Sequence, residues 1–143
     1  MRRTKKISGQ RGAMLLELAL VLPLLLLIVM LVLSLTLVVR THQVLNNAAR
    51  EGARLAVQPE NKGNTADITT QVSNYASQNG VTITAGNVTI NQNALIANGA
   101  TSISASIVTV DYTYSPNFVA VLALLGAPTS FQLEGKAEFR NFY

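Results

Sequence analysis

The chain has 143 residues and contains no cysteine and one histidine. Thiolate metal sites, cysteine nucleophiles and iron–sulfur clusters are therefore excluded. The formal net charge is +4, from 11 lysines and arginines against 7 acids, but five of the bases and none of the acids lie in residues 1–12. The remaining residues carry six bases and seven acids, so the excess positive charge does not indicate a nucleic-acid-binding surface.

A long apolar segment follows the basic residues. Ala13–Val39 has 27 residues, and Glu17 is the only charged one. Its last 22 residues, Leu18–Val39, exceed the ~20 that an α-helix needs to cross ~30 Å of hydrocarbon. A secretory signal peptide usually has a shorter apolar region of ~7–15 residues. We therefore predict a transmembrane helix, with the basic residues on the cytoplasmic side and the chain after Arg40 outside.

The carboxylate of Glu17 lies near the start of this segment. Ionisable residues within a membrane helix are costly, so each is a functional hypothesis that needs a named partner. The alternative is that Glu17 lies at the headgroup boundary, close enough to Arg11 to remain hydrated.

The residues around Glu17 resemble a known processing site. The run RGAMLLELALVLP at residues 11–23, followed by NAAREGAR at residues 47–54, resembles the TadE-like pseudopilins of tight-adherence (Flp) pilus systems, which are type IV pilin-like proteins. The resemblance is strong over residues 1–57 and continues only in outline. It implies that a prepilin peptidase cuts between Gly12 and Ala13 on the cytoplasmic face, and that Glu17 becomes the fifth residue of the mature chain.

Such a cut would give Glu17 a partner. The new α-amino group on Ala13 would be largely protonated at neutral pH, and a charge in apolar surroundings needs to be neutralised. Glu17 lies one helical turn from Ala13. Its carboxylate can therefore neutralise the amino group of its own helix or that of a neighbouring subunit.

Beyond the membrane the helix is predicted to continue to Val57. The first proline after the apolar segment is Pro59, and a proline disfavours helix at the residue before it. A helix over residues 13–57 would be about 68 Å long. Ala48, Gly52 and Ala56 recur every four residues in it, and small side chains allow another element to approach closely. We predict that most of this stripe packs on the chain's own sheet, with a subunit contact added in the assembled state.

Two single residues on this helix have local consequences. Pro23 removes one backbone donor and crowds the carbonyl of Ala19, so it predicts a kink in the helix. An equal alternative is an ordinary transmembrane proline without any consequence for function. His42 lies just outside the membrane boundary. A metal site needs several converging ligands, so we expect His42 to be solvated or interfacial.

Residues 58–143 are predicted to form one small domain that begins with a helix. The helix covers Thr65–Gln78, with Thr65 as its cap and Asn79-Gly80 as its end. The side chains expected on its buried face follow a helical period, and they are Ile68, Val72, Tyr75 and Ala76.

Three strands are predicted next, at Val81–Asn91, Ser102–Tyr114 and Ser130–Arg140. The apolar alternation changes phase at Gly86-Asn87 in the first strand and after Ile107 in the second, and a phase change inside a strand indicates a β-bulge. In the third strand the residues expected to face inward are Phe131, Leu133, Ala137 and Phe139. One buried and one exposed face is typical of an antiparallel sheet, here of three or more strands.

The apolar run Phe118–Leu125 is too short to span a membrane. Three hypotheses remain open for it: a short buried helix, a loop resting on the membrane, and a contact with another subunit. Burial in the core is favoured, because so small a domain needs all of its apolar side chains.

The sequence thus predicts an α+β protein in three parts. These are a basic cytoplasmic leader (1–12) that is removed, a transmembrane and stem helix (13–57), and an extracytoplasmic head (58–143). The expected location is the bacterial inner membrane, with the head periplasmic or extracellular, or in the pilus. No phosphate-binding loop, dinucleotide motif or Ser/His/Asp set is found. We therefore expect no enzyme activity, no cofactor and no metal.

The resemblance implies a minor pilin or pseudopilin that acts in assembly or priming of a Tad/Flp (type IVc) pilus, and so in adhesion and surface attachment. The implied partners are the membrane, a prepilin peptidase, other pilins or pseudopilins and the Tad secretion machinery, without nucleic acid or a small-molecule substrate. A second hypothesis is an unprocessed single-pass inner-membrane anchor that presents a periplasmic binding head. The position of the mature N-terminus distinguishes the two.

Overall fold

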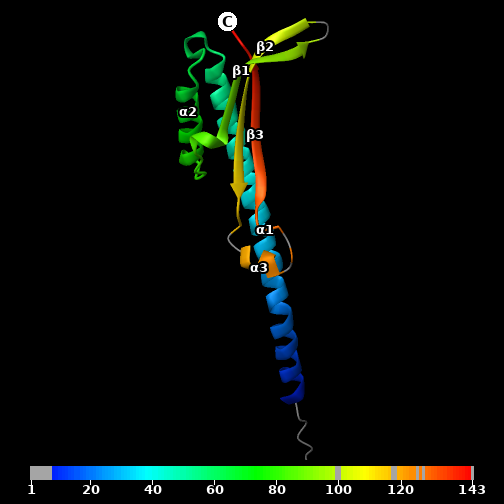
Figure 1. The fold of residues 1–143 in the computed structure, drawn as a ribbon. Helices are drawn as coiled ribbons and strands as arrows, with labels where there is room; N and C mark the ends of the chain where they lie inside the picture. The colour runs from blue at the N-terminus through cyan, green and yellow to red at the C-terminus, as the bar shows by residue number, and fades with distance from the viewer. Residues whose placement is uncertain (1–7, 99–100, 117–118, 125, 127, 143) are drawn as a thin grey trace, which may run out of the picture. The chain divides into compact units, whose positions relative to one another are not determined.

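The computed structural model describes residues 8–98, 101–116, 119–124, 126 and 128–142. The chain divides into two compact units, Met1–Leu37 and Val38–Tyr143, and we call the second unit the head. The elements in chain order are α1 (Ser8–Ala56), η1 (Pro59–Asn61), α2 (Thr65–Gln78), η2 (Ala85–Asn87), β1 (Val88–Asn98), β2 (Thr101–Tyr114), α3 (Val119–Leu124) and β3 (Phe131–Arg140) (Figure 1). A long helix, a short helix and a three-stranded antiparallel sheet confirm the predicted α+β class.

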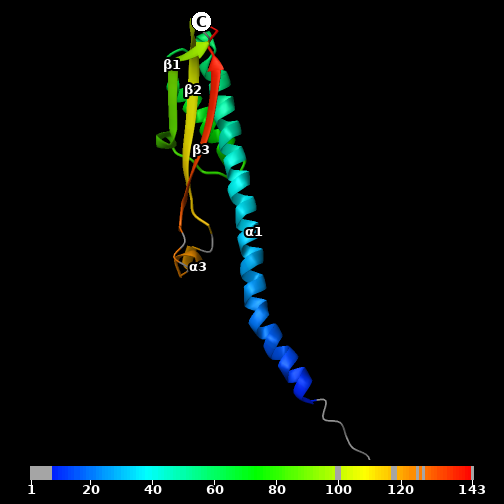
Figure 2. The ribbon, with the colours of Figure 1, turned by 90° about the vertical axis from the view of Figure 1, so that its right-hand side faces the viewer.

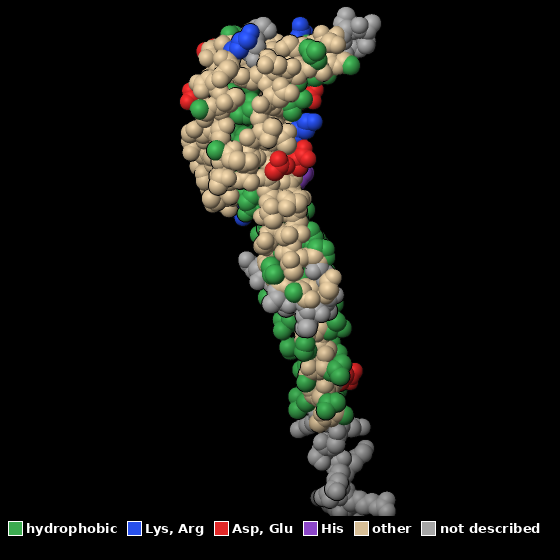
Figure 3. Space-filling model, viewed as in Figure 1, with side chains coloured by type: hydrophobic (Ala, Val, Ile, Leu, Met, Phe, Trp, Pro, Cys, Tyr) green, Lys and Arg blue, Asp and Glu red, His purple; other side chains and the backbone are tan. Residues whose placement is uncertain are grey.

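The first unit consists, in its described part, of the apolar portion of α1. Residues 12–33 are all exposed, and hydrophobic side chains lie along the helix on the face seen in Figure 3. By length and composition this helix is able to cross a membrane. The hydroxyls of Ser34 and Thr36 donate to backbone carbonyls one turn earlier, at 2.7 and 3.1 Å. Both polar side chains are therefore satisfied within the helix.

The helix α1 differs slightly from the predicted stem at both ends. It begins at Ser8, so the end of the predicted leader is already helical, and it ends at Ala56. Pro23 lies inside the helix without ending it. At the C-terminal end the N–H of Gln58 donates to the carbonyl of Leu55 at 3.1 Å. This tighter turn, directly before Pro59, closes the helix.

The helix α2 has the predicted bounds, but its cap is different. The side chain of Asn64, not Thr65, accepts a hydrogen bond from the N–H of Asp67 at 3.4 Å. Asn64 has the non-helical backbone that an N-cap needs, whereas Thr65 is already helical. The helix ends as expected before Gly80, whose φ of +82° suits glycine.

The sheet has the order β1-β2-β3, with both pairs antiparallel. Val88 lies opposite Val110, and Tyr114 lies opposite Phe131. The predicted first strand was wrong over residues 81–87, which lie outside the sheet, and the strand instead runs from Val88 to Asn98. The bulge predicted at Gly86-Asn87 was also wrong, because these residues belong to η2. The local cause is Asn87, whose side chain accepts hydrogen bonds from the N–H and the hydroxyl of Thr84 at 2.9 and 2.7 Å. Such side-chain bonds favour a turn over a strand.

The predicted bulge in the second strand was also misplaced. The register shifts in β1, where the residues between Asn91 and Ala94 lie opposite the single Ser106 of β2. The extra residue therefore belongs to β1, and β2 runs without interruption through the phase change.

The core of the head lies between the sheet and the helices α1 and α2. Its buried side chains come from all of these layers and include Leu45, Ala49, Ala53, Ile68, Val72, Val108, Val110 and Ala137. The backbones of α1 and β3 approach each other at Gly135 of β3, where an added Cβ would lie 2.4 Å from the backbone carbon of Leu45. Only a glycine allows α1 and β3 to lie so close.

The inward face of β3 was predicted only in part. Ala137 is buried and Leu133 is half-buried against the core, but Phe131 and Phe139 are 38% and 43% exposed. The prediction for these two phenylalanines was wrong because the close contact at Gly135 covers the middle of the strand, whereas Phe131 is its first residue and Phe139 its last but one.

The apolar run Phe118–Leu125 contains α3, although Phe118 and Leu125 themselves lie outside the described residues. Val119 and Leu122 are half-buried and Ala123 is exposed. None of these three belongs to the core of the head. Core burial was therefore the wrong expectation for these side chains, because α1 and α2 already cover the inner face of the sheet.

Candidate processing and assembly site

Gly12 and Ala13 are both exposed on α1. A Cβ added to Gly12 would have no atom within 4 Å. Glycine in a helix is ~1 kcal/mol less favourable than alanine. Packing within the described chain therefore gives no reason for a glycine at this position, in contrast to Gly135.

Glu17 is exposed on the same helix. It lies four residues after Ala13, a rise of about 6 Å along the axis, and side chains at this spacing share one face. The ion pair recorded among the described residues lies elsewhere, in the head. The helix thus places the carboxylate within reach of residue 13 and leaves it accessible to a neighbouring molecule.

The small residues of the stripe face the interior of the head. Ala48 and Ala56 are completely buried. A Cβ on Gly52 would lie 2.4 Å from Cγ2 of Val72 and 3.3 Å from Cγ1 of Val108. Gly52 therefore lies where α1, α2 and β2 meet, and the chain's own head fills this stripe.

A buried polar cluster holds the end of α1 against the sheet. The carbonyl of Ala56, at the last residue of the helix, accepts a hydrogen bond from Nε2 of Gln92 at 3.1 Å, and Oγ of Ser106 lies 3.3 Å from the same carbonyl. Helix ends leave such carbonyls without a partner in the helix. Gln92 lies at the bulge of β1, which explains how a strand residue reaches the helix end.

The cluster continues to the C-terminal end of the chain. Oδ1 of Asn141 accepts from the hydroxyl of Ser106 at 2.7 Å, and its Nδ2 donates to the carbonyl of Gln92 at 2.9 Å and to Ser104 Oγ at 2.7 Å. Gln92, Ser106 and Asn141 are at most 8% exposed. Buried polar groups of this kind are stable only when they are paired. The cluster therefore ties together α1, β1, β2 and the residue that follows β3.

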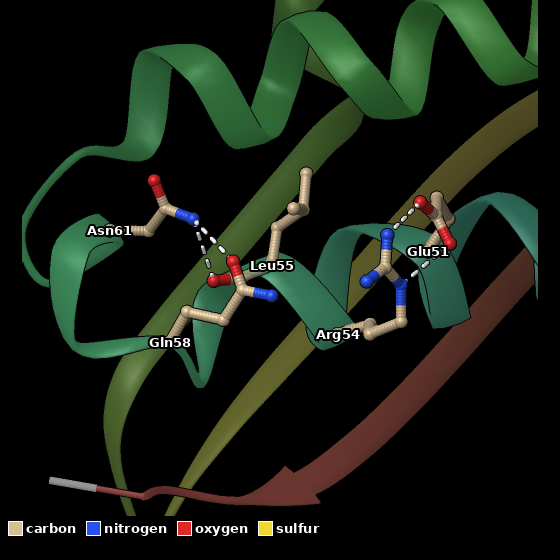
Figure 4. Close-up of polar contacts among 5 residues, drawn as sticks. All are labelled: Glu51, Arg54, Leu55, Gln58 and Asn61. Carbon is tan, nitrogen blue, oxygen red and sulfur yellow. Dashed lines mark hydrogen bonds and ion pairs between the residues drawn. The ribbon is translucent and has the colours of Figure 1, made fainter.

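The exposed side of the same helix end carries an ion pair (Figure 4). The guanidinium of Arg54 donates to both carboxylate oxygens of Glu51, at 2.7 and 3.1 Å. This hydrogen bonding lowers the pKa of Glu51 below its usual value. Nearby, Nδ2 of Asn61 donates to the carbonyl of Leu55 at 3.1 Å and so holds the loop after α1.

The polar cluster was not predicted from the sequence. The sequence contains one indication of it, since Asn91-Gln92-Asn93 interrupts an otherwise alternating strand. Nothing in the sequence indicates that Asn141 completes the cluster, because this contact spans 49 residues of chain. His42, expected to be solvated, is exposed, and one of its ring nitrogens lies 3.2 Å from Nδ2 of Asn46.

A helix that is able to cross a membrane by length and composition, followed by a small α+β head, is consistent with a membrane-anchored protein. Residues 12–54, which lie within α1, match the model of the TadE-like protein family. This match confirms the resemblance predicted from residues 11–23 and 47–54. No curated protein and no solved structure matches the chain.

Proposed function

We propose that the protein is a minor pilin or pseudopilin, a structural component in the assembly or priming of a Tad/Flp pilus without a reaction of its own. In this role it contributes to adhesion and surface attachment. The supporting observation is the match to the TadE-like family, which begins at Gly12. In the same helix Glu17 lies one turn after Ala13. The head is the part that remains outside the cytoplasm, as the basic N-terminal residues favour.

Cleavage between Gly12 and Ala13 removes the basic leader and leaves an amino group on Ala13. In apolar surroundings this group needs a counter-charge, which Glu17 provides in its own helix or in a neighbouring subunit. Among the described residues no atom lies within 4 Å of a Cβ added to Gly12, which fits a glycine that is selected by a peptidase and not by packing. The partners are a prepilin peptidase, other pilins or pseudopilins and the Tad secretion machinery.

The test is the intact mass of protein extracted from membranes of cells that carry the peptidase. We expect a chain that begins at Ala13, and Gly12→Leu should abolish the cut. Glu17→Gln should leave cleavage and protein level intact but reduce co-purification with other pilins at least tenfold, since ~1.4 kcal/mol corresponds to tenfold. A native chain that still begins at Met1 would instead support the unprocessed anchor. A Glu17→Gln variant that assembles like the parent would contradict the role of the carboxylate.

A further inference from the structure

The two edges of the sheet are protected to different degrees, and β3 is the protected one. The backbone N–H of Lys136 donates to Oδ1 of Asn46 on α1 at 3.2 Å, and Gly135 lies against the backbone of Leu45. The helix α1 therefore lies along the middle of this edge, as Figure 2 shows. The strand also carries Glu134, Lys136, Glu138 and Arg140. Helix cover and charged side chains are two devices that prevent an edge strand from pairing with another chain.

The strand β1 has no charged side chain and no proline. Among the described residues it pairs with β2 alone. A bulge between Asn91 and Ala94 protects that point of the edge, but the pairing is regular from Ala94 to Asn98. The strand lies within a stretch of 43 residues, Ile68–Val110, that contains no Asp, Glu, Lys or Arg. Leu95, just after the bulge, is 74% exposed. A long uncharged edge strand is suited to pairing with a further strand.

We propose that the β1 edge is a pairing surface for β1 of a second copy of this chain, so that the two sheets join about a twofold axis. Copies can pair edge to edge only through edges that are uncovered. Pairing of β1 with β3 of another copy is blocked by α1, which leaves β1 with β1. This surface is separate from the processing site, and the proposal does not depend on cleavage at Gly12.

The charges favour the same partner. Like charges opposite one another destabilise antiparallel pairs, and two copies of β1 bring no charges together. A charged strand from another protein would find no counter-charge along β1. In a register centred near Leu95, antiparallel pairing also buries the two exposed leucine side chains against each other.

The absence of cysteine from the chain allows a direct test by single-cysteine crosslinking. The full-length protein in membranes is given one cysteine at a time at exposed β1 positions, Thr89, Asn91, Leu95 and Ala97, and then oxidised. We expect disulfide-linked homodimers at one or two neighbouring positions, because only residues near the twofold axis bring their own Cβ atoms within ~5 Å. Thr70→Cys, on the exposed face of α2, is the control for chance collisions.

A second variant tests the energetics. Leu95→Lys places like charges across the axis and should lower the crosslinking of the best cysteine about tenfold, whereas Thr70→Lys, with the same added charge, should not. No homodimer above the Thr70→Cys level, or equal crosslinking at every position, would overturn the proposal. A crosslinked product whose mass shows a different protein would also overturn it, since the occupant would not be a second copy.

Discussion

Replacement of Gly135 by alanine is the sharpest test of the packing between α1 and β3. The new Cβ would lie 2.4 Å from the carbonyl carbon of Leu45, 2.6 Å from its oxygen and 2.7 Å from the nitrogen of Asn46. Carbon atoms in contact normally lie ~3.5–4.0 Å apart, so strand and helix would have to separate by about 1 Å or more. Overpacking of this kind costs ~1–3 kcal/mol and occasionally more, and these neighbours are backbone atoms that cannot rotate away.

Two effects set the expected size of the change. Alanine regains ~0.5–1 kcal/mol in a strand because glycine loses more entropy on folding. The net loss is then about 1–2 kcal/mol, which lowers the Tm of a domain of this size by roughly 5–15 °C. The measurement is the near-UV circular dichroism of the tyrosines during heating of the full-length protein in detergent. All four tyrosines belong to the head, so the signal reports its unfolding.

A matched control is Gly86→Ala, since the nearest atom to its added Cβ is Oγ1 of Thr84 at 3.9 Å. Its Tm should stay within 1–2 °C of the parent value, a shift of about ±0.3 kcal/mol. Gly52→Ala should fall between the two, because a helical alanine regains ~1 kcal/mol while its Cβ meets the side chain of Val72 instead of backbone. If Gly135→Ala unfolds at the same temperature as Gly86→Ala, the close contact of α1 with β3 does not limit the stability of the head.

Two further predictions concern polar contacts of the head. Asn141→Ala leaves the carbonyl of Gln92 without its donor and should lower the free energy of unfolding by ~1–3 kcal/mol. Its Tm should therefore be lower than that of the control Asn74→Ala, which changes an exposed residue. Equal Tm values would mean that the cluster does not hold the helix end. For Glu51, whose folded pKa is lowered, the stabilisation is present above the unfolded pKa and is lost as the pH falls through the folded pKa. Glu51→Gln should therefore lower the Tm slightly at pH 7, and this difference should vanish in acid; a difference that persists there would contradict the assigned cause.

The elements predicted well are those whose evidence is local. The helix α2 was predicted with the bounds Thr65–Gln78 because a helical period and a terminal glycine lie within the segment itself. The apolar part of α1 was evident from composition alone. The error in the cap of α2, by one residue, arose because Asn64 and Thr65 are both good capping residues and only the backbone conformation distinguishes them.

The errors arose where distant segments decide the structure. Val81–Thr84 has the alternation of a strand, but its apolar residues Val81 and Ile83 are buried in the core of the head without pairing in the sheet. Phe131 and Phe139 alternate correctly with Leu133, yet whether they are covered depends on where α1 touches the strand. The roles of Gln92 and Asn141 depend on the bulge in β1 and on a contact across the whole domain. Apart from the run Asn91-Gln92-Asn93, none of these contacts has a local pattern.

The structure gives different explanations for the two segments that carried the resemblance. The segment at residues 47–54 lies in the head, where Ala48 and Gly52 permit the close approach of α2 and β2, and where Glu51 and Arg54 pair on the exposed side. Its small residues are thus accounted for by packing within the chain. The segment at residues 11–23 has exposed side chains from Gly12 onward, and nothing inside the described chain requires its glycine or its carboxylate. The packing of the head therefore explains the second segment, whereas the contacts of the described residues do not explain the glycine and the carboxylate of the first.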